Sequence, residues 1–223
     1  MSIVTEAFEI VAALGTADSF EISTAMRSSG AWLFGTIVTL LAGCLMVVIY
    51  KTFPIIDRHL DRSVMVWSYL AIAAIIFWGV IDRFIFSNQQ PWSTTIPPLL
   101  FMIMAWYGCA YNVRLRTHLS FSEFRGRMPR SGQLACLILD NALWLIFCII
   151  IVTTTLRVTA NSASNFQIVL GTDNVMQWWF ILTVPVAFIL LAARAIENVM
   201  DDFANWRSGE PLIQQAVIGE EPS

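Results

Sequence analysis

The chain has 223 residues, of which 57% are hydrophobic and only 13% are charged, and its formal net charge is −3. About a quarter of the residues in a soluble domain are charged, so this composition, with a mean hydropathy of +0.67, excludes an ordinary soluble protein. We therefore expect a protein whose solvent is lipid and whose function lies within or beside a bilayer.

Five apolar stretches are each about as long as the roughly 17 to 25 residues that a membrane-spanning helix requires. They comprise residues 31–50, 64–81, 97–113, 134–156 and 176–196. The connections between them are too short to form a soluble domain. The sequence therefore predicts an all-α integral membrane protein with five transmembrane helices.

The segment before the first stretch, residues 1–30, is mildly acidic and is predicted to be an extracytoplasmic leader. We do not expect a cleaved signal peptide, because the first half of this segment carries Glu6 and Glu9 and no basic residue. Residues 1–14 are instead predicted to form a short interfacial helix.

Prolines predict where the spans begin, break or bend. Pro54 interrupts any helix that continues from the first stretch, so residues 31–63 are expected to form an N-terminal transmembrane helix and a cytoplasmic connection. Pro97 and Pro98 are expected to open the third span, where a missing backbone N–H costs least. Pro185, in the middle of the last span, predicts a kink.

Basic residues are divided unevenly between the two sides of the predicted bundle, and Lys and Arg near short loops tend to stay in the cytoplasm. One side holds only Arg27, Arg83 and Arg157 of the thirteen basic residues. We therefore place the N-terminus in the periplasm and the C-terminus in the cytoplasm, as expected for a bacterial inner-membrane protein. The other side holds Lys51, Arg58, Arg62, Arg114, Arg116, Arg125, Arg127, Arg130, Arg194 and Arg207.

Residues suited to catalysis are scarce. A membrane haem anchor requires histidines inside spans, but His59 and His118 lie in or beside predicted loops. The four cysteines form no CxxC pair, and the sequence contains no HExxH motif, glycine-rich phosphate loop or Ser/His/Asp group. We therefore expect no enzymatic activity, no metal site and no cofactor.

Two features inside the spans are candidates for an interface. Asp140 lies about two turns from the cytoplasmic end of the fourth span, and an ionisable residue within a span is a functional candidate. A structural or partner contact, through water or a loop arginine, is favoured there over ion or proton coupling. Gly108, beside Ala105, Cys109 and Ala110, gives the third span a small-residue face on which another helix can pack closely.

The order and spacing of several motifs in residues 64–205 resemble those of a known family. These motifs are Arg83-Phe84-Ile85-Phe86, Trp92, Gly108-Cys109-Ala110, Arg114 with His118, Trp178-Trp179, Pro185 and Arg194. They resemble the small, Q-type (DctQ-like) permease subunit of tripartite ATP-independent periplasmic (TRAP) transporters.

Two features depart from the pattern of that family. Its members usually carry a glutamate shortly after the tryptophan, whereas Thr94 and Thr95 occupy these positions, so a pairing of Arg83 with that acid is lost. The family subunit usually has four helices. The leader and the first helix, residues 1–63, therefore lie outside the resemblance.

The resemblance implies a non-catalytic subunit of a secondary transporter. A large permease subunit would hold the substrate and sodium sites, and a periplasmic binding protein would deliver an organic acid. This chain, surrounded by membrane lipid and with no nucleic-acid partner, would brace the large subunit, and residues 206–223 would form a cytoplasmic tail. The residues expected to fix the fold or the interface are Arg83, Trp92, Gly108, Arg114, His118, Asp140 and Pro185.

Two alternatives remain open at this point. A stand-alone homo-oligomeric carrier or channel requires polar residues along one face of a span, and only Asn112, Asp140 and Asn141 are available. A redox-enzyme membrane anchor is disfavoured by the positions of the histidines. The transported substrate is not encoded in this chain, because other polypeptides select it in the resembled family.

Overall fold

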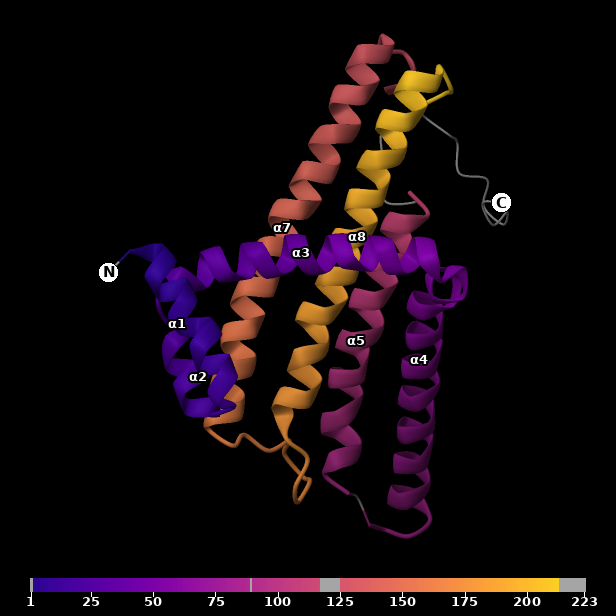
Figure 1. Cartoon of the computed structure of the whole chain (residues 1–223). Helices are drawn as coiled ribbons and strands as arrows, with labels where there is room; N and C mark the ends of the chain where they lie inside the picture. Colours follow the sequence, from indigo (N-terminus) through magenta and orange to yellow (C-terminus); the bar gives the residue numbers. More distant parts are fainter. Residues whose placement is uncertain (1, 89, 117–124, 213–223) are drawn as a thin grey trace.

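The computed structural model describes residues 2–88, 90–116 and 125–212 (Figure 1). The described part is helical and holds no strand beyond an isolated bridge, which confirms the all-α prediction. The five longer helices are long and apolar enough to cross a membrane, as predicted. The helices are α1 (Ile3–Thr16), α2 (Ser19–Ala25), α3 (Gly30–Thr52), α4 (Pro54–Phe84), α5 (Trp92–Arg114), α7 (Arg130–Ser164) and α8 (Gln177–Ser208).

Four of the long helices stand side by side in the order α7, α8, α5 and α4 (Figure 1). The ring of Phe188 in α8 joins three of them, because its centroid lies 4.7 Å from that of Trp106 in α5 and 5.5 Å from that of Phe147 in α7. Ala110 and Val152 are fully buried beside it. The main apolar core therefore forms along α8, which is the most buried of the long helices.

Helix α3 lies across this row of four helices (Figure 1). Gly35 packs so closely on α7 that an added Cβ atom would overlap the hydroxyl group of Thr153. Further along, a Cβ atom on Gly43 would lie 3.6 Å from that of Ala192 in α8, and Tyr50 shares a core cluster with residues of α4 and α5. Successive turns of α3 thus contact successive helices, and glycine permits the close crossings. The sequence left open whether this helix packs on the others.

The prolines break the chain of helices as predicted at Pro54, but they do not mark the start of α5. A helix break at Pro54 is confirmed, because α4 begins there. However, α4 then runs unbroken to Phe84, so the predicted cytoplasmic connection forms its first turns. Helix α5 begins at Trp92, and Pro97 and Pro98 therefore lie inside it. Hydroxyl groups of the Ser-Thr-Thr sequence before these prolines bond to carbonyls one turn earlier and stabilise the additional turn.

The α4–α5 and α7–α8 connections pack together where these four helices end on one side of the bundle, and we term this side the loop end. Gly171 in the α7–α8 connection has a φ of +82°, and a Cβ atom there would lie 2.5 Å from the Cβ of Pro91. Glycine alone fits such a position without strain. The hydroxyl group of Thr95 in α5 donates to the carbonyl of Leu170 at 2.7 Å. The two connections therefore hold each other in place.

The helix predicted within residues 1–14 is present as α1, and it caps the N-terminus of α3. The carboxylate of Glu6 accepts a hydrogen bond from the hydroxyl group of Ser29 at 2.6 Å and from the backbone N–H of Gly30 at 2.8 Å. These two bonds, the Ser29 bond foremost, lower the pKa of Glu6 below its ordinary value. Helix α1 thus supplies the capping bond that the side chain of Ser29, at the N-cap position of α3, does not make.

Helix α7 also contacts this end of α3. The guanidinium group of Arg157 donates to the carbonyl of Ser28 at 2.9 Å and lies over the ring of Trp32 at 5.4 Å. Arg27 donates to the side chain of Asn161 at 3.3 Å. The N-terminal end of α3 is therefore fixed to both α1 and α7.

Candidate functional site

Charged side chains from α4, α5 and α8 converge where the C-terminal end of α3 crosses them. Arg194 of α8 lies at the centre and is 1% exposed. Its guanidinium group pairs with the carboxylates of Asp57, Asp61 (3.1 Å) and Glu197 (2.9 Å). The ring of Tyr50 covers it, with 3.8 Å from the guanidinium carbon to the ring centroid. We refer to the following residues as the Arg194 cluster: Tyr50, Asp57, Asp61, Arg114, Arg194 and Glu197.

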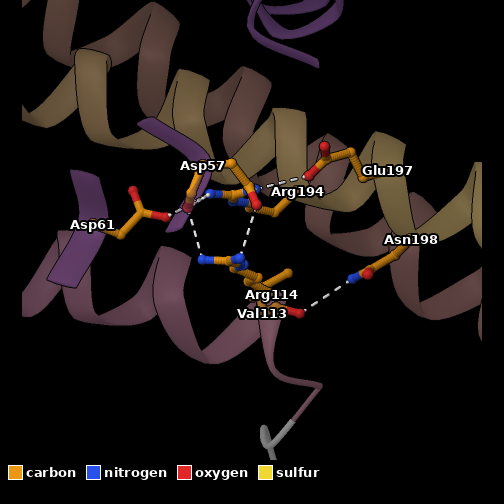
Figure 2. Close-up of polar contacts among 7 residues, drawn as sticks. All are labelled: Asp57, Asp61, Val113, Arg114, Arg194, Glu197 and Asn198. Carbon is orange, nitrogen blue, oxygen red and sulfur yellow. Dashed lines mark hydrogen bonds and ion pairs between the residues drawn. The ribbon is translucent and has the colours of Figure 1, made fainter. Parts of the chain in front are cut away.

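Asp57 joins two guanidinium groups, as Figure 2 shows. One carboxylate oxygen accepts from Arg194 and the other accepts from Arg114 at 2.8 Å. The backbone carbonyl of Asp57 also accepts from Arg194 at 3.1 Å and from Arg114 at 2.7 Å. Asp57 lies in the first turn of α4, where the helix dipole favours a negative charge. The start of α4 is therefore fastened to the end of α5 and to α8.

A second polar network lies further along α8. Asp202 is fully buried, and its carboxylate accepts from Arg116 at 2.5 Å and from the side-chain amide of Asn141 in α7 at 3.4 Å. The side-chain amide of Asn198 donates to the carbonyl of Val113 at 3.2 Å (Figure 2). This network ties the end of α5 to both α7 and α8.

The Arg194 cluster is suited to holding helices together. Its two arginines and three carboxylates leave one negative charge in excess. Inside a low-polarity core each charge needs its partners, so the loss of Arg194 would leave the buried carboxylate of Asp61 without its ion pair. Among the residues that the structure describes, no group of three or more His, Cys, Asp or Glu is placed to hold a metal ion. The geometry is that of a fixed joint between four helices.

Two of the predicted site residues lie at the loop end, at the opposite ends of α4 and α5 from the cluster. The side chain of Arg83 is exposed and its guanidinium group lies 5.8 Å from the ring centroid of Phe84, whereas the neighbouring Asp82 is buried. Trp92 begins α5, and its backbone nitrogen would lie 2.7 Å from a Cβ atom on Gly171. Arg83 thus lies in the last turn of α4, and Trp92 lies where the two connections meet.

The other predicted residues are dispersed. Gly108 faces α4, where a Cβ atom would lie 3.3 Å from the sulfur of Met65, so this small-residue face is used within the chain. Asp140 pairs with Arg125 at 2.5 Å. Pro185 is buried in the middle of α8. His118 lies outside the described residues.

Of the predicted site residues, only Arg114 belongs to the Arg194 cluster. Arg194 entered only the prediction of the orientation and the family motifs, and Asp57 entered no prediction. Two signals were present: Arg194 lies inside the last apolar stretch, where an ionisable residue is costly, and Asp57 and Asp61 are four residues apart and so share one face of a helix.

A comparison with known protein families identifies the chain. The family model described as "Tripartite ATP-independent periplasmic transporters, DctQ component" matches residues 72–205. The chain belongs to this DctQ family. The resemblance drawn from the sequence motifs is thereby confirmed, and the chain is a TRAP transporter small permease subunit and a multi-pass membrane protein.

A curated relative is also named as a TRAP transporter small permease protein. The sialic acid TRAP transporter small permease protein SiaQ of Vibrio cholerae serotype O1 (strain ATCC 39315 / El Tor Inaba N16961) is 24% identical over 166 residues, which cover 73% of this chain and 94% of that protein.

The segment that matches the DctQ model begins within α4 and ends within α8, so α1, α2 and α3 lie outside it. The Arg194 cluster spans this boundary: Arg114 and Arg194 lie inside the matched segment, and Asp57 and Asp61 lie outside it.

Proposed function

We propose that this DctQ-family chain braces the large permease subunit of a TRAP transporter that takes up an organic acid. The large subunit would hold the substrate and use the sodium gradient, and a periplasmic binding protein would deliver the substrate. The chain itself would be neither an enzyme nor a cofactor-binding protein. The family match supports this assignment, and the V. cholerae relative is named for sialic acid, which is a carboxylated sugar.

The observation that carries the proposal is the way α3 is fixed across the row. A moving element of a transporter needs contacts that can exchange between two arrangements. In this chain the crossing helix is held by glycine contacts with α7 and α8 and by Tyr50, whose ring lies against the buried guanidinium group of Arg194. Such contacts suit the static part of a transporter.

We further propose a bacterial inner-membrane location with the loop end facing the periplasm. The excess of Lys and Arg on the opposite side supports this orientation. Helix α2 packs on α7, and Arg27, which follows α2, donates to Asn161 close to the end of α7 at Ser164. In this orientation α2 lies on the periplasmic side, which supports a periplasmic N-terminus.

Purification of a tagged copy from its native membrane in a mild detergent, followed by mass spectrometry, tests the proposal. We expect a larger polytopic permease in an amount equal to that of the tagged chain. An unrelated small membrane protein with the same tag, purified in parallel, controls for adventitious capture. Recovery of the chain alone, or as a homo-oligomer, would contradict a bracing role.

A further inference from the structure

Charges in the first turns of α4 are sorted by sign onto two faces. Asp57 and Asp61, four residues apart, both point into the Arg194 cluster (Figure 2). Arg58 and Arg62 have the same spacing but follow by one residue, which places them about 100° further around the helix. Both arginines are exposed. The inward acids pair with Arg194 and Arg114, and the outward face of these turns presents basic side chains.

The end of α3 adds to this charge. Lys51 lies in the last turn of α3, and only Phe53 separates that helix from α4, so the two helices meet at a sharp corner (Figure 1). Lys51 and His59 are exposed. Among the described residues, no acidic side chain pairs with Lys51 or Arg58. We refer to Lys51, Arg58, His59 and Arg62 as the basic corner.

Beyond the basic corner the same face of α4 becomes apolar. Val66, Tyr69 and Leu70 continue from Arg62 at helical spacing and are 43%, 60% and 48% exposed. Phe77, two turns further, is 68% exposed. Within the described structure α4 packs mainly on α5 and, near its start, on α3. One face of α4 is thus a long apolar stripe with a cluster of positive charge at one end.

This layout fits an amphiphile with a negative head. Lys and Arg at the end of a membrane helix attract the phosphates of anionic lipids, and acyl chains pack on the apolar surface below them. A water-soluble anion would use the corner alone. An acidic protein segment would have no use for an apolar stripe that runs along a membrane helix. We propose that the basic corner and the exposed face of α4 bind an anionic phospholipid, with Lys51 and Arg58 in contact with its headgroup.

Native mass spectrometry of the protein, purified in a non-ionic detergent with the subunits that accompany it, tests this inference. Phosphatidylglycerol and phosphatidylcholine with identical acyl chains are titrated in turn. We expect tighter binding of phosphatidylglycerol, and the double variant K51Q/R58Q should bind it about fivefold more weakly for each charge removed. The charge-conserving variant K51R/R58K should retain the affinity.

A matched control removes two exposed arginines elsewhere. R127Q/R207Q has the same net charge as K51Q/R58Q, and it should bind phosphatidylglycerol as the wild type does. All four substituted side chains are exposed, so helical content and melting temperature should be unchanged.

Three outcomes would overturn the proposal. In the first, the wild type does not distinguish the two lipids. In the second, K51Q/R58Q binds phosphatidylglycerol as tightly as R127Q/R207Q does. In the third, glycerol phosphate displaces the lipid at equal concentration, which would show that the stripe adds nothing. Loss of an accompanying subunit in K51Q/R58Q with lipid affinity unchanged belongs to the second outcome and would assign the corner to a protein partner. The inference does not depend on the bracing function.

Discussion

The two ends of α3 are fixed by different kinds of contact. Its C-terminal end lies over Arg194, which is 1% exposed and pairs with three carboxylates. Its N-terminal end is held by hydrogen bonds from Ser29 and Gly30 to the partly exposed Glu6 and by the bond from Arg157 to the Ser28 carbonyl.

The difference between the two ends shows how burial determines what a polar contact does. Charges buried together are costly to separate, because the partner left behind has no water to replace the lost ion pair. A partly exposed carboxylate that loses its hydrogen bonds is solvated by water instead, so the loss of these bonds lowers the stability of the fold only slightly. We therefore expect substitutions at the C-terminal end of α3 to destabilise the fold strongly. Substitutions at its N-terminal end should destabilise the fold only slightly.

The largest effect is expected for Arg194→Met. The methionine retains most of the apolar stem, but Asp57 and Asp61 lose their buried partner, which typically costs roughly 3–5 kcal/mol. Thermal unfolding in detergent, followed by circular dichroism, should show a melting temperature many degrees lower. Arg207→Met on the exposed end of the same helix is the control and should leave the melting temperature near that of the wild type. Equal melting temperatures for the two variants would contradict the importance of the cluster.

A smaller effect is expected for Gly35→Ala, which tests the crossing between the two ends. The added methyl group would overlap the Thr153 hydroxyl, and overpacking of this kind costs about 1–3 kcal/mol. Gly15→Ala is the control, because a Cβ atom there meets nothing within 4 Å and alanine favours the helix. The same unfolding experiment should show a lower melting temperature for Gly35→Ala alone. A melting temperature as high as that of Gly15→Ala would mean that α3 does not lie this close to α7.

Arg157→Gln should loosen the N-terminal end by about 1–2 kcal/mol, since it removes the bond to the Ser28 carbonyl and the contact with the ring of Trp32. Hydrogen exchange measured by mass spectrometry should be faster in peptides from α2 and the start of α3. Peptides that contain Arg194 serve as the internal reference and should exchange as in the wild type. Faster exchange in both regions would show that the two ends of α3 are not independent.

The smallest effect is expected at Glu6, and it depends on pH. Because the folded-state pKa of Glu6 lies below its ordinary value of 4.5, the ionised carboxylate stabilises the fold at neutral pH, and this contribution is lost as the pH falls through the lowered pKa. Glu6→Gln should therefore melt slightly below the wild type at pH 7, and the difference should disappear in strongly acidic buffer. A difference that persists there would mean that shape rather than charge matters at this cap.

Much of the fold follows from local chemistry that the sequence displays. Apolar length alone predicts five long helices, and Pro54 predicts the break between α3 and α4. The start of α5 was less predictable, because hydroxyl groups before Pro97 add a turn that hydropathy does not register. Hydropathy also does not indicate how a helix is oriented relative to its neighbours. It therefore could not distinguish a helix that stands in the row from one that lies across it.

The Arg194 cluster was harder to predict for a related reason. Arg194, Asp57 and Arg114 are far apart in the sequence, and no local pattern indicates that they meet. Their mutual contacts depend on the crossing of α3 and on the packing of α4 against α5, which are tertiary features. Asp140 was a more conspicuous candidate, yet it pairs with Arg125 outside the cluster.

The single row of α7, α8, α5 and α4 gives this small chain an unusual outline in the plane of a bilayer (Figure 1). Packed helices lie roughly 8–10 Å apart, so four in a row extend over about 30–40 Å, which is about twice the width of the same four helices arranged in a square. A row also has two free edges, whereas a square bundle has none. Lipid and protein neighbours can therefore border the same subunit at opposite edges without competing for the same helices.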